Sequence, residues 1–202
     1  MPPVTRTLLI ANVAGFLLQL AGGGATLVAW FALWPPAAGP VPRPDFQFWQ
    51  LVTYGFLHGG LTHLLFNMIG LYMFGSDIER LFGPRFFLQY YFACVVTAAL
   101  THLAASAWMG SPPLPTVGAS GGLFGLLLAF GWYFPRRTVM LIFPPVPLPA
   151  RVFVAAYGAL ELFLGVGGSG SGVAHFAHLG GMLGGVLMIQ QRRGGFPFGR
   201  RR

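Results

Sequence analysis

The chain has 202 residues, of which 55% are apolar, 15% aromatic and only 8% charged, whereas about 25% of the residues of an ordinary soluble domain are charged. Four acidic and twelve basic side chains cannot cover the surface of a water-soluble domain of this size, so the composition excludes that class. The 30 glycines and 17 prolines do not indicate disorder, because disordered chains are poor in apolar residues. A single cysteine, Cys94, excludes an intramolecular disulfide and a multi-cysteine metal site. The composition therefore predicts an integral membrane protein.

Six apolar runs are separated by charges or prolines, and a spanning helix needs about 20 mostly apolar residues. The runs cover residues 7–33, 61–78, 86–109, 117–134, 148–166 and 173–190. Three glycines at 22–24 predict that the first span bends or ends early, and its long apolar run is not that of a cleaved signal peptide. Pro135 and the prolines between 144 and 149 separate the later spans, since proline cannot donate to a helix ladder. We predict an all-α fold, a single polytopic domain over residues 1–202 with six transmembrane helices.

The basic residues indicate the orientation of this bundle. All twelve are arginine, and the net charge is +8. When loops alternate between the two sides, only Arg43 falls opposite the other eleven arginines. The positive-inside rule then places both termini, including the tail 191–202, in the cytoplasm. We therefore expect the arginines to contact anionic lipid headgroups of the bilayer and not nucleic acid.

The segment 34–60 is predicted to be a long outer loop. It is rich in proline and carries Trp34, Phe46, Phe48, Trp49 and Tyr54. Aromatic side chains at this density and position suit the membrane interface. The loop is therefore expected to lie partly among the lipid headgroups.

Polar residues within the spans are informative, because each needs a partner away from water. His58, His63 and Asn67 gather at the outer end of the second span. His63 and Asn67 are four residues apart, so they share a helix face and could point into one cavity. The alternative is that they hydrogen-bond a neighbouring helix and hold the bundle together.

A second cluster, the sequence GASGG at residues 118–122, begins the fourth span. The first N–H groups of a helix are unpaired and carry the positive end of its dipole. Ser120 could therefore present its hydroxyl while nearby backbone N–H groups bind a developing oxyanion. The alternative is an N-cap serine followed by glycines that allow tight helix packing.

A third cluster begins the sixth span with His175 and His178. His178, Gly181 and Gly185 form one stripe along the helix, which allows another helix to approach closely. Two glycines four residues apart, Gly121 and Gly125, provide a matching surface on the fourth span just after the serine. Contact between these stripes would bring the serine hydroxyl and the His178 imidazole together as nucleophile and general base.

The sequence predicts no carboxylate beside this pair. Asp45 lies in the outer loop, Asp77 and Glu79 lie on the cytoplasmic side, and Glu161 lies in the fifth span away from the motif. We therefore expect a Ser-His dyad, with the imidazole oriented by packing, in place of a triad. Glu161 is either a functional intramembrane carboxylate or a protonated packing residue.

Together these residues resemble the rhomboid family of intramembrane serine proteases, over about residues 49–185. The matching segments, in chain order, are WQLVT at 49–53 with Phe56 and His58, His63 with Asn67 and Met68, GASG at 118–121, and Ala177-His178 with Gly181 and Gly185. The order and spacing of the four motifs are specific. The resemblance implies a six-helix bundle of rhomboid type, with Ser120 as nucleophile and His178 as base. It also implies an oxyanion site formed by His63, Asn67 and the backbone N–H of Ser120, with supporting roles for Gly118, Gly121, Phe124, Gly181, Gly185 and His58.

Two positions depart from the family pattern. Gln50 stands where the family often has arginine, which bears on ion contacts in the outer loop. Phe124 stands where the family often has a tyrosine that stacks on the catalytic histidine, and phenylalanine keeps the ring. Of the two histidines in the sixth span, the register with the paired glycines favours His178 over His175 as the base.

The resemblance implies a serine endopeptidase that needs no cofactor or metal. Its substrates would be membrane proteins with a transmembrane segment, cleaved near the outer face after passing between the second and fifth spans. The alternatives are an inactive relative that binds membrane proteins for trafficking or quality control, and a metalloprotease using His58, His63, His175 and His178. The first would have lost the nucleophile or base, and the second lacks an H-E-x-x-H pairing. A small transporter would show internal repeats or paired broken helices, and the sequence shows neither.

Overall fold

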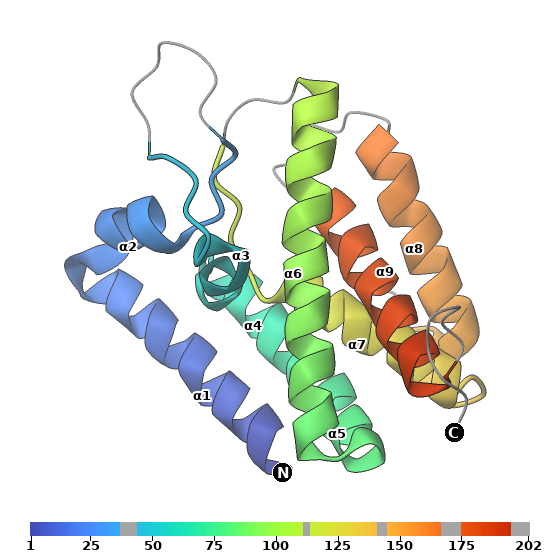
Figure 1. Cartoon of the computed structure of the whole chain (residues 1–202). Coiled ribbons are helices and arrows are strands. Elements are labelled where there is room, and N and C mark those ends of the chain that lie inside the picture. Colours follow the sequence, from blue (N-terminus) through green and yellow to red (C-terminus); the bar gives the residue numbers. More distant parts are fainter. Residues whose placement is uncertain (37–43, 111–113, 141–144, 167–174, 195–202) are drawn as a thin grey trace.

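The structure, a computed structural model, describes residues 1–36, 44–110, 114–140, 145–166 and 175–194. Arg43, residues 173–174 at the expected start of the sixth span, and the tail from residue 195 lie outside the described residues. Within the described residues, each of the six apolar ranges is largely helical. The helices, of which α6 (Pro84–Met109) is the longest, run along one another as a bundle (Figure 1).

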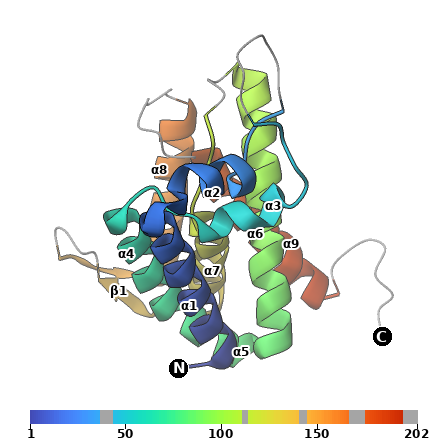
Figure 2. The same cartoon turned by 90° about the vertical axis from the view of Figure 1, so that its left-hand side faces the viewer.

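The first apolar range bends where the glycines predicted it. Helix α1 (Pro3–Leu18) ends in a π-helical turn, η1 (Gln19–Gly23), before α2 (Gly24–Phe31). Gly22 has a φ of +99°, a backbone conformation that favours glycine. As a result α1 runs along the bundle, whereas α2 runs across it above α1 (Figure 2).

The segment 34–60 is more structured than the predicted loop. It contains the short helix α3 (Gln50–Thr53) and the 3-10 turn η2 (Tyr54–Phe56). Gln50 is fully buried, accepts a hydrogen bond from the Trp34 N–H and donates one to the Trp30 carbonyl. The hydroxyl of buried Tyr54 donates to the carbonyl of Val95 on α6. This part of the segment is therefore packed on the bundle, because its polar groups find partners there.

The second apolar range contains α4 (Leu61–Gly70), the π-helical turn η3 (Leu71–Gly75) and α5 (Ser76–Phe82). After α6, the chain forms α7 (Ser120–Tyr133), α8 (Ala150–Val166) and α9 (His175–Arg192). A short antiparallel hairpin, β1 (Thr138–Met140) and β2 (Pro147–Pro149), joins α7 to α8. From the prolines we predicted only that the helices are interrupted here. The strands themselves could not be predicted, since three residues are too few to show the alternation of apolar and polar residues.

The predicted contact between glycine stripes is present between α7 and α9. A Cβ added to Gly181 would collide with the carbonyl oxygen of Gly121, and one on Gly125 would lie 3.1 Å from the carbonyl oxygen of Gly181. Gly185 instead faces the Tyr90 hydroxyl on α6 and a leucine of α7. A second glycine pair on α9, Gly180 and Gly184, packs against Thr97 and its neighbours on α6, which the sequence analysis did not predict. Helix backbones can approach each other this closely only where the facing residues are glycines, which have no side chain.

Apolar exposure agrees with a lipid environment. By length and hydropathy, two described helices, Pro3–Phe31 and Pro84–Met109, are long and apolar enough to cross a membrane. Large apolar side chains on the outside of the bundle are exposed, among them Ile10 at 62%, Leu65 at 53% and Phe163 at 73%. Soluble monomers rarely expose such surfaces over several elements.

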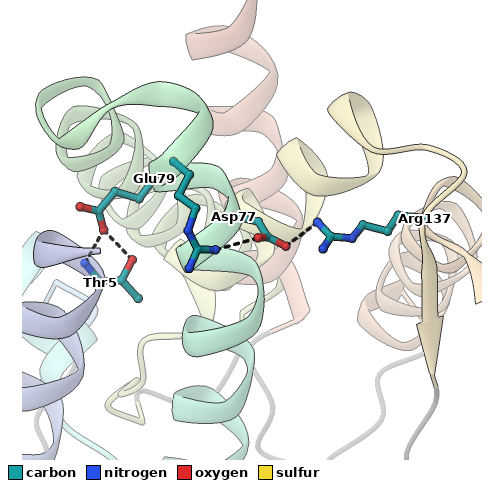
Figure 3. A network of polar contacts seen from close by, with 5 residues as sticks. Thr5, Asp77, Glu79 and Arg137 are labelled. Atoms are coloured by element: carbon teal, nitrogen blue, oxygen red, sulfur yellow. Dashed lines mark hydrogen bonds and ion pairs between the residues drawn. The ribbon is translucent and has the colours of Figure 1, made fainter. Parts of the chain in front are cut away.

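Charged groups gather where α1 begins and α5 ends, a region that we call the arginine end. The Asp77 carboxylate pairs with Arg80 at 3.0 Å and with Arg137, beyond the end of α7, at 2.7 Å (Figure 3). The buried Glu79 carboxylate accepts hydrogen bonds from the N–H groups of Val4 and Thr5 and from the Thr5 hydroxyl (Figure 3). These contacts tie the start of α1 to α5 and to the loop after α7.

Candidate active site

Ser120 and His178 meet although they are 58 residues apart, as the glycine stripes predicted. The Ser120 Oγ lies 2.9 Å from the Nε2 of His178. Ser120 is the first residue of α7, and His178 lies in the first turn of α9. His178 is 8% exposed, whereas the serine is half-buried and can be reached by a substrate. An imidazole whose Nε2 carries no proton can accept the serine proton at this distance.

The backbone before Ser120 requires glycine for two reasons. Gly118 has a φ of +127°, which L side chains rarely adopt. A Cβ there would also lie 2.7 Å from the Nε2 of His63. The Gly118 N–H donates to the carbonyl of Tyr54, which fixes this segment against η2. The result is a serine at a helix start, directly beside an imidazole from α4.

His63 and Asn67 share one face of α4, as their spacing predicted. The Nδ1 of His63 accepts a hydrogen bond from the Gly59 N–H at 3.3 Å. A neutral His63 must then carry its proton on Nε2, the atom that faces Gly118 next to the serine. The Asn67 amide nitrogen donates to the His63 carbonyl at 2.8 Å, which holds the two side chains together. This arrangement aims an N–H donor from α4 toward the serine.

His58 contacts the site through His63. The two rings pack edge to face, with their centroids 5.2 Å apart. The backbone N–H and carbonyl of His58 both pair with the Gln19 amide in η1. Neither ring nitrogen has a hydrogen-bond partner among the described residues. Burial, and after it the charge of His63, lowers the pKa of His58 to about 4. Beside it lies an open cavity of about 470 Å³ between η1 and the start of α4, which does not include Ser120 or His178 in its lining.

The ring of Phe124 stacks on the imidazole of His178. The ring centroids are 4.0 Å apart and the planes differ by 5°. On its other face Phe124 stacks on Tyr157 of α8, and Tyr157 stacks in turn on Phe153. The stacking does not need the hydroxyl that phenylalanine lacks. The sequence analysis did not identify Tyr157, because nothing in the sequence relates α8 to α7.

The expectation that no carboxylate accompanies the serine and histidine is wrong. The Oε2 of Glu161 lies 2.7 Å from the Nδ1 of His175, which hydrogen-bonds it, and 2.9 Å from the Nδ1 of His178. The second contact is close, although the Nδ1–H of His178 is not aligned on the oxygen as a hydrogen bond requires. Packing of α8 against the start of α9 causes this, because the two histidines are three residues apart and both face α8. Two features of the sequence could have indicated this contact: the three-residue spacing of the two histidines and the carboxylate within a membrane span.

His175 therefore contacts Glu161, whereas His178 contacts Ser120. Ligand atoms of Glu161, His175 and His178 lie within 4.8 Å of one another, so this group could hold a cation. Tetrahedral zinc with bonds of about 2.1 Å would keep its ligand atoms about 3.4 Å apart. The contacts of 2.7 and 2.9 Å are shorter and fit direct contact between a carboxylate and N–H groups.

Comparison with known proteins identifies relatives. The rhomboid domain family matches residues 45–192. "RHOMBOID-like protein 12, mitochondrial" of Arabidopsis thaliana is 33% identical over 165 residues, which cover 73% of this chain and 48% of that protein. Rhomboid protease GluP of Bacillus subtilis is 28% identical over 172 residues, 85% of this chain and 31% of that protein. Rhomboid protease GlpG of Photorhabdus laumondii is 25% identical over 186 residues, 92% of this chain and 60% of that protein. The chain thus spans between 31% and 60% of the length of these three relatives.

Proposed function

Because the chain belongs to the rhomboid family, an integral membrane family, we propose that it is an intramembrane serine endopeptidase. The 2.9 Å contact between Ser120 Oγ and His178 Nε2 is the observation that carries this proposal. Two of the relatives are named rhomboid proteases, which supports a protease. The family supports an integral membrane protein, and its relatives include mitochondrial and chloroplastic proteins. We further propose a six-span bundle with both termini in the cytoplasm of a bacterial inner membrane, on the distribution of the arginines.

The reaction follows from the two side chains. The Ser120 proton passes to the Nε2 of His178 as Oγ attacks the carbonyl carbon of the scissile peptide bond. The C–N bond then breaks, and His178 returns the proton to the leaving amine. Water activated by the same imidazole hydrolyses the acyl-enzyme and restores the serine.

The negative oxygen of the intermediate needs donors that are in place before the reaction. His63 would supply its Nε2–H, since its Nδ1 is occupied by the Gly59 N–H. The Asn67 amide and the Ser120 N–H at the start of α7 would supply the others. Gly118 permits this arrangement, because any side chain there would displace His63.

The depth of the site supports cleavage near the outer face. Helices α4, α7 and α9 all begin below the upper end of α6, on the side away from the N-terminus (Figure 1). We propose that substrates are single transmembrane segments that unwind at small or helix-breaking residues and reach the serine between α4 and α8.

An inactive relative that binds membrane proteins is the second candidate, and the retained Ser120–His178 contact argues against it. A fluorophosphonate probe separates the two, since it labels only an activated serine. Labelling of the wild type that disappears in Ser120→Ala, and persists in the matched variant Ser106→Ala on α6, supports the enzyme. No labelling of the folded wild type would favour the inactive protein.

The decisive experiment uses the full chain in lipid vesicles with a reporter that has one transmembrane segment. We expect cleavage by the wild type and by Ser106→Ala. Ser120→Ala and His178→Ala should each lose nearly all activity, by about 10⁴-fold or more. Cleavage retained by Ser120→Ala would refute the proposal.

A further inference from the structure

We propose that Glu161 is a positioning residue that acts on the base, so that Ser120, His178 and Glu161 form a functional triad in place of a dyad. This inference rests on the proposed protease function. It concerns how α8 controls the imidazole, and it assigns a role to a carboxylate that the reaction above does not use.

The two nitrogens of His178 face different partners. Its Nε2 lies 2.9 Å from Ser120 Oγ, and its Nδ1 lies 2.9 Å from Glu161 Oε2. An ionised carboxylate only accepts hydrogen bonds, so it favours the tautomer with the proton on Nδ1. That tautomer leaves the lone pair on Nε2, which is the atom that must take the serine proton. Contact with Glu161 therefore selects the form of His178 that can act as a base.

Glu161 can impose this tautomer because it is itself held in place. It is 4% exposed, and the same Oε2 accepts a hydrogen bond from His175 at 2.7 Å. The stacked ring of Phe124 fixes the plane of the His178 imidazole. We expect Nδ1–H to align on the carboxylate when substrate binds, since catalytic hydrogen bonds often tighten only in the complex.

The carboxylate also matters after the proton moves. When Ser120 gives its proton to Nε2, His178 becomes an imidazolium. Glu161 stays ionised throughout, because it takes up no proton and forms no covalent bond. The opposite charge at 2.9 Å stabilises this imidazolium in a site with little water. His175 anchors the carboxylate and does not face the serine, so removing it should have a smaller effect than removing Glu161.

The test compares Glu161→Gln with Glu79→Gln in the vesicle assay. Both carboxylates are buried, but among the described residues the hydrogen bonds to the Glu79 carboxylate come from α1. Glu161→Gln should lower kcat by about 10- to 10³-fold with little change in KM, since Glu161 does not touch substrate. Per folded molecule, Glu79→Gln should keep the wild-type kcat.

The pH profile gives a readout that a merely structural role would not move. Without the carboxylate the imidazolium is less stable, so the acidic limb of the kcat/KM profile should move to lower pH in Glu161→Gln. The other titratable groups near His178 are His63 on α4 and His102 on α6, which interact with it, and His175 on α9, which contacts the same carboxylate. All three remain in this variant. Glu161→Asp keeps the charge, so the acidic limb of its profile should stay near that of the wild type. Its kcat should lie between those of the wild type and Glu161→Gln.

Each outcome decides the matter. Wild-type kcat and an unchanged profile in folded Glu161→Gln would overturn the triad and leave the protease standing, provided that Ser120→Ala is inactive. If Glu161→Gln does not fold, Glu161→Asp replaces it in the test: an acidic limb displaced from that of the wild type, although the charge is kept, would equally overturn the triad. Loss of wild-type activity on chelation, restored by Zn²⁺, would show that the three residues hold a metal. Activity in Ser120→Ala would mean that the proposed function itself is wrong.

Discussion

Two buried glutamates at opposite ends of the bundle illustrate how partners decide what a carboxylate does. Glu79 is 2% exposed and Glu161 is 4% exposed. Glu79 accepts hydrogen bonds from two backbone N–H groups and a hydroxyl at the start of α1, whereas Glu161 contacts two imidazoles. The partners of Glu79 keep the same charge at every ordinary pH. The partners of Glu161 can gain a proton, and the proposed role in the reaction belongs to this second carboxylate.

This contrast teaches that burial of a charged group does not identify a site by itself. Glu79 neutralises unpaired N–H groups at a helix start, where the dipole also favours a negative charge. Changes at the arginine end should therefore affect stability, and changes around Ser120 should affect activity. The following predictions test that division, beginning with the contact that both properties depend on.

Gly181→Ala should cause the largest loss. Its methyl group would collide with the carbonyl of Gly121, which is backbone and cannot move aside. Separation of α7 from α9 should lower the free energy of unfolding by about 3 kcal/mol or more and part Ser120 from His178. Thermal unfolding and reporter cleavage measure the two effects. Gly158→Ala on α8, where an added Cβ would lie at an ordinary 3.4 Å from the flexible Met182 side chain, is the control for packing, and equal stability of both variants would contradict the interpretation.

Asn67→Ala should lower activity by about 10- to 10³-fold with a smaller change in stability. The amide is proposed to bind the oxyanion, and its loss leaves the His63 carbonyl without that donor. The measurement is kcat/KM for the reporter, together with the unfolding temperature. A variant that loses stability but keeps the wild-type kcat/KM would assign Asn67 to helix packing instead.

Glu79→Gln should show the opposite pattern. Loss of the charged acceptor for Val4 and Thr5 should lower the free energy of unfolding by about 1 to 3 kcal/mol, with kcat unchanged per folded molecule. Asp77→Asn at the same end is the matched control. Its partners Arg80 and Arg137 are more than half exposed, so its effect should stay under about 1 kcal/mol. Equal effects of the two variants would remove the distinction between them.

The last prediction is a dependence of stability on pH at His58. Its pKa is lowered to about 4 in the fold, against 6.5 ordinarily, so the unfolded chain binds the proton first. Its contribution therefore lowers stability as pH falls from about 6.5 to about 4, and is constant below that. His58→Gln should flatten the curve of unfolding free energy in this window. An identical slope in wild type and variant would show that His58 is exposed to water in the fold.

Much of the fold and of the site could be predicted because the signals are local. Apolar runs and arginines gave the helical ranges, and three adjacent glycines predicted the bend at Gly22. The pairing of Ser120 with His178 was also predictable, since each lies a fixed helical spacing from glycines that force close contact. The short α3, the turn η2 and the β1–β2 hairpin were not, because segments of three or four residues show no period.

By itself, the amino-acid sequence determined that this chain is a membrane protein, which helices it forms and which serine and histidine meet. Only the tertiary structure decided what lies on the other side of the imidazole. Helix α8 exposes apolar side chains over much of its surface, so its sequence does not show which way it is rotated against α7 and α9. That rotation brings Tyr157 to the ring of Phe124 and Glu161 to His178, because it depends on the packing of three helices and not on any one of them.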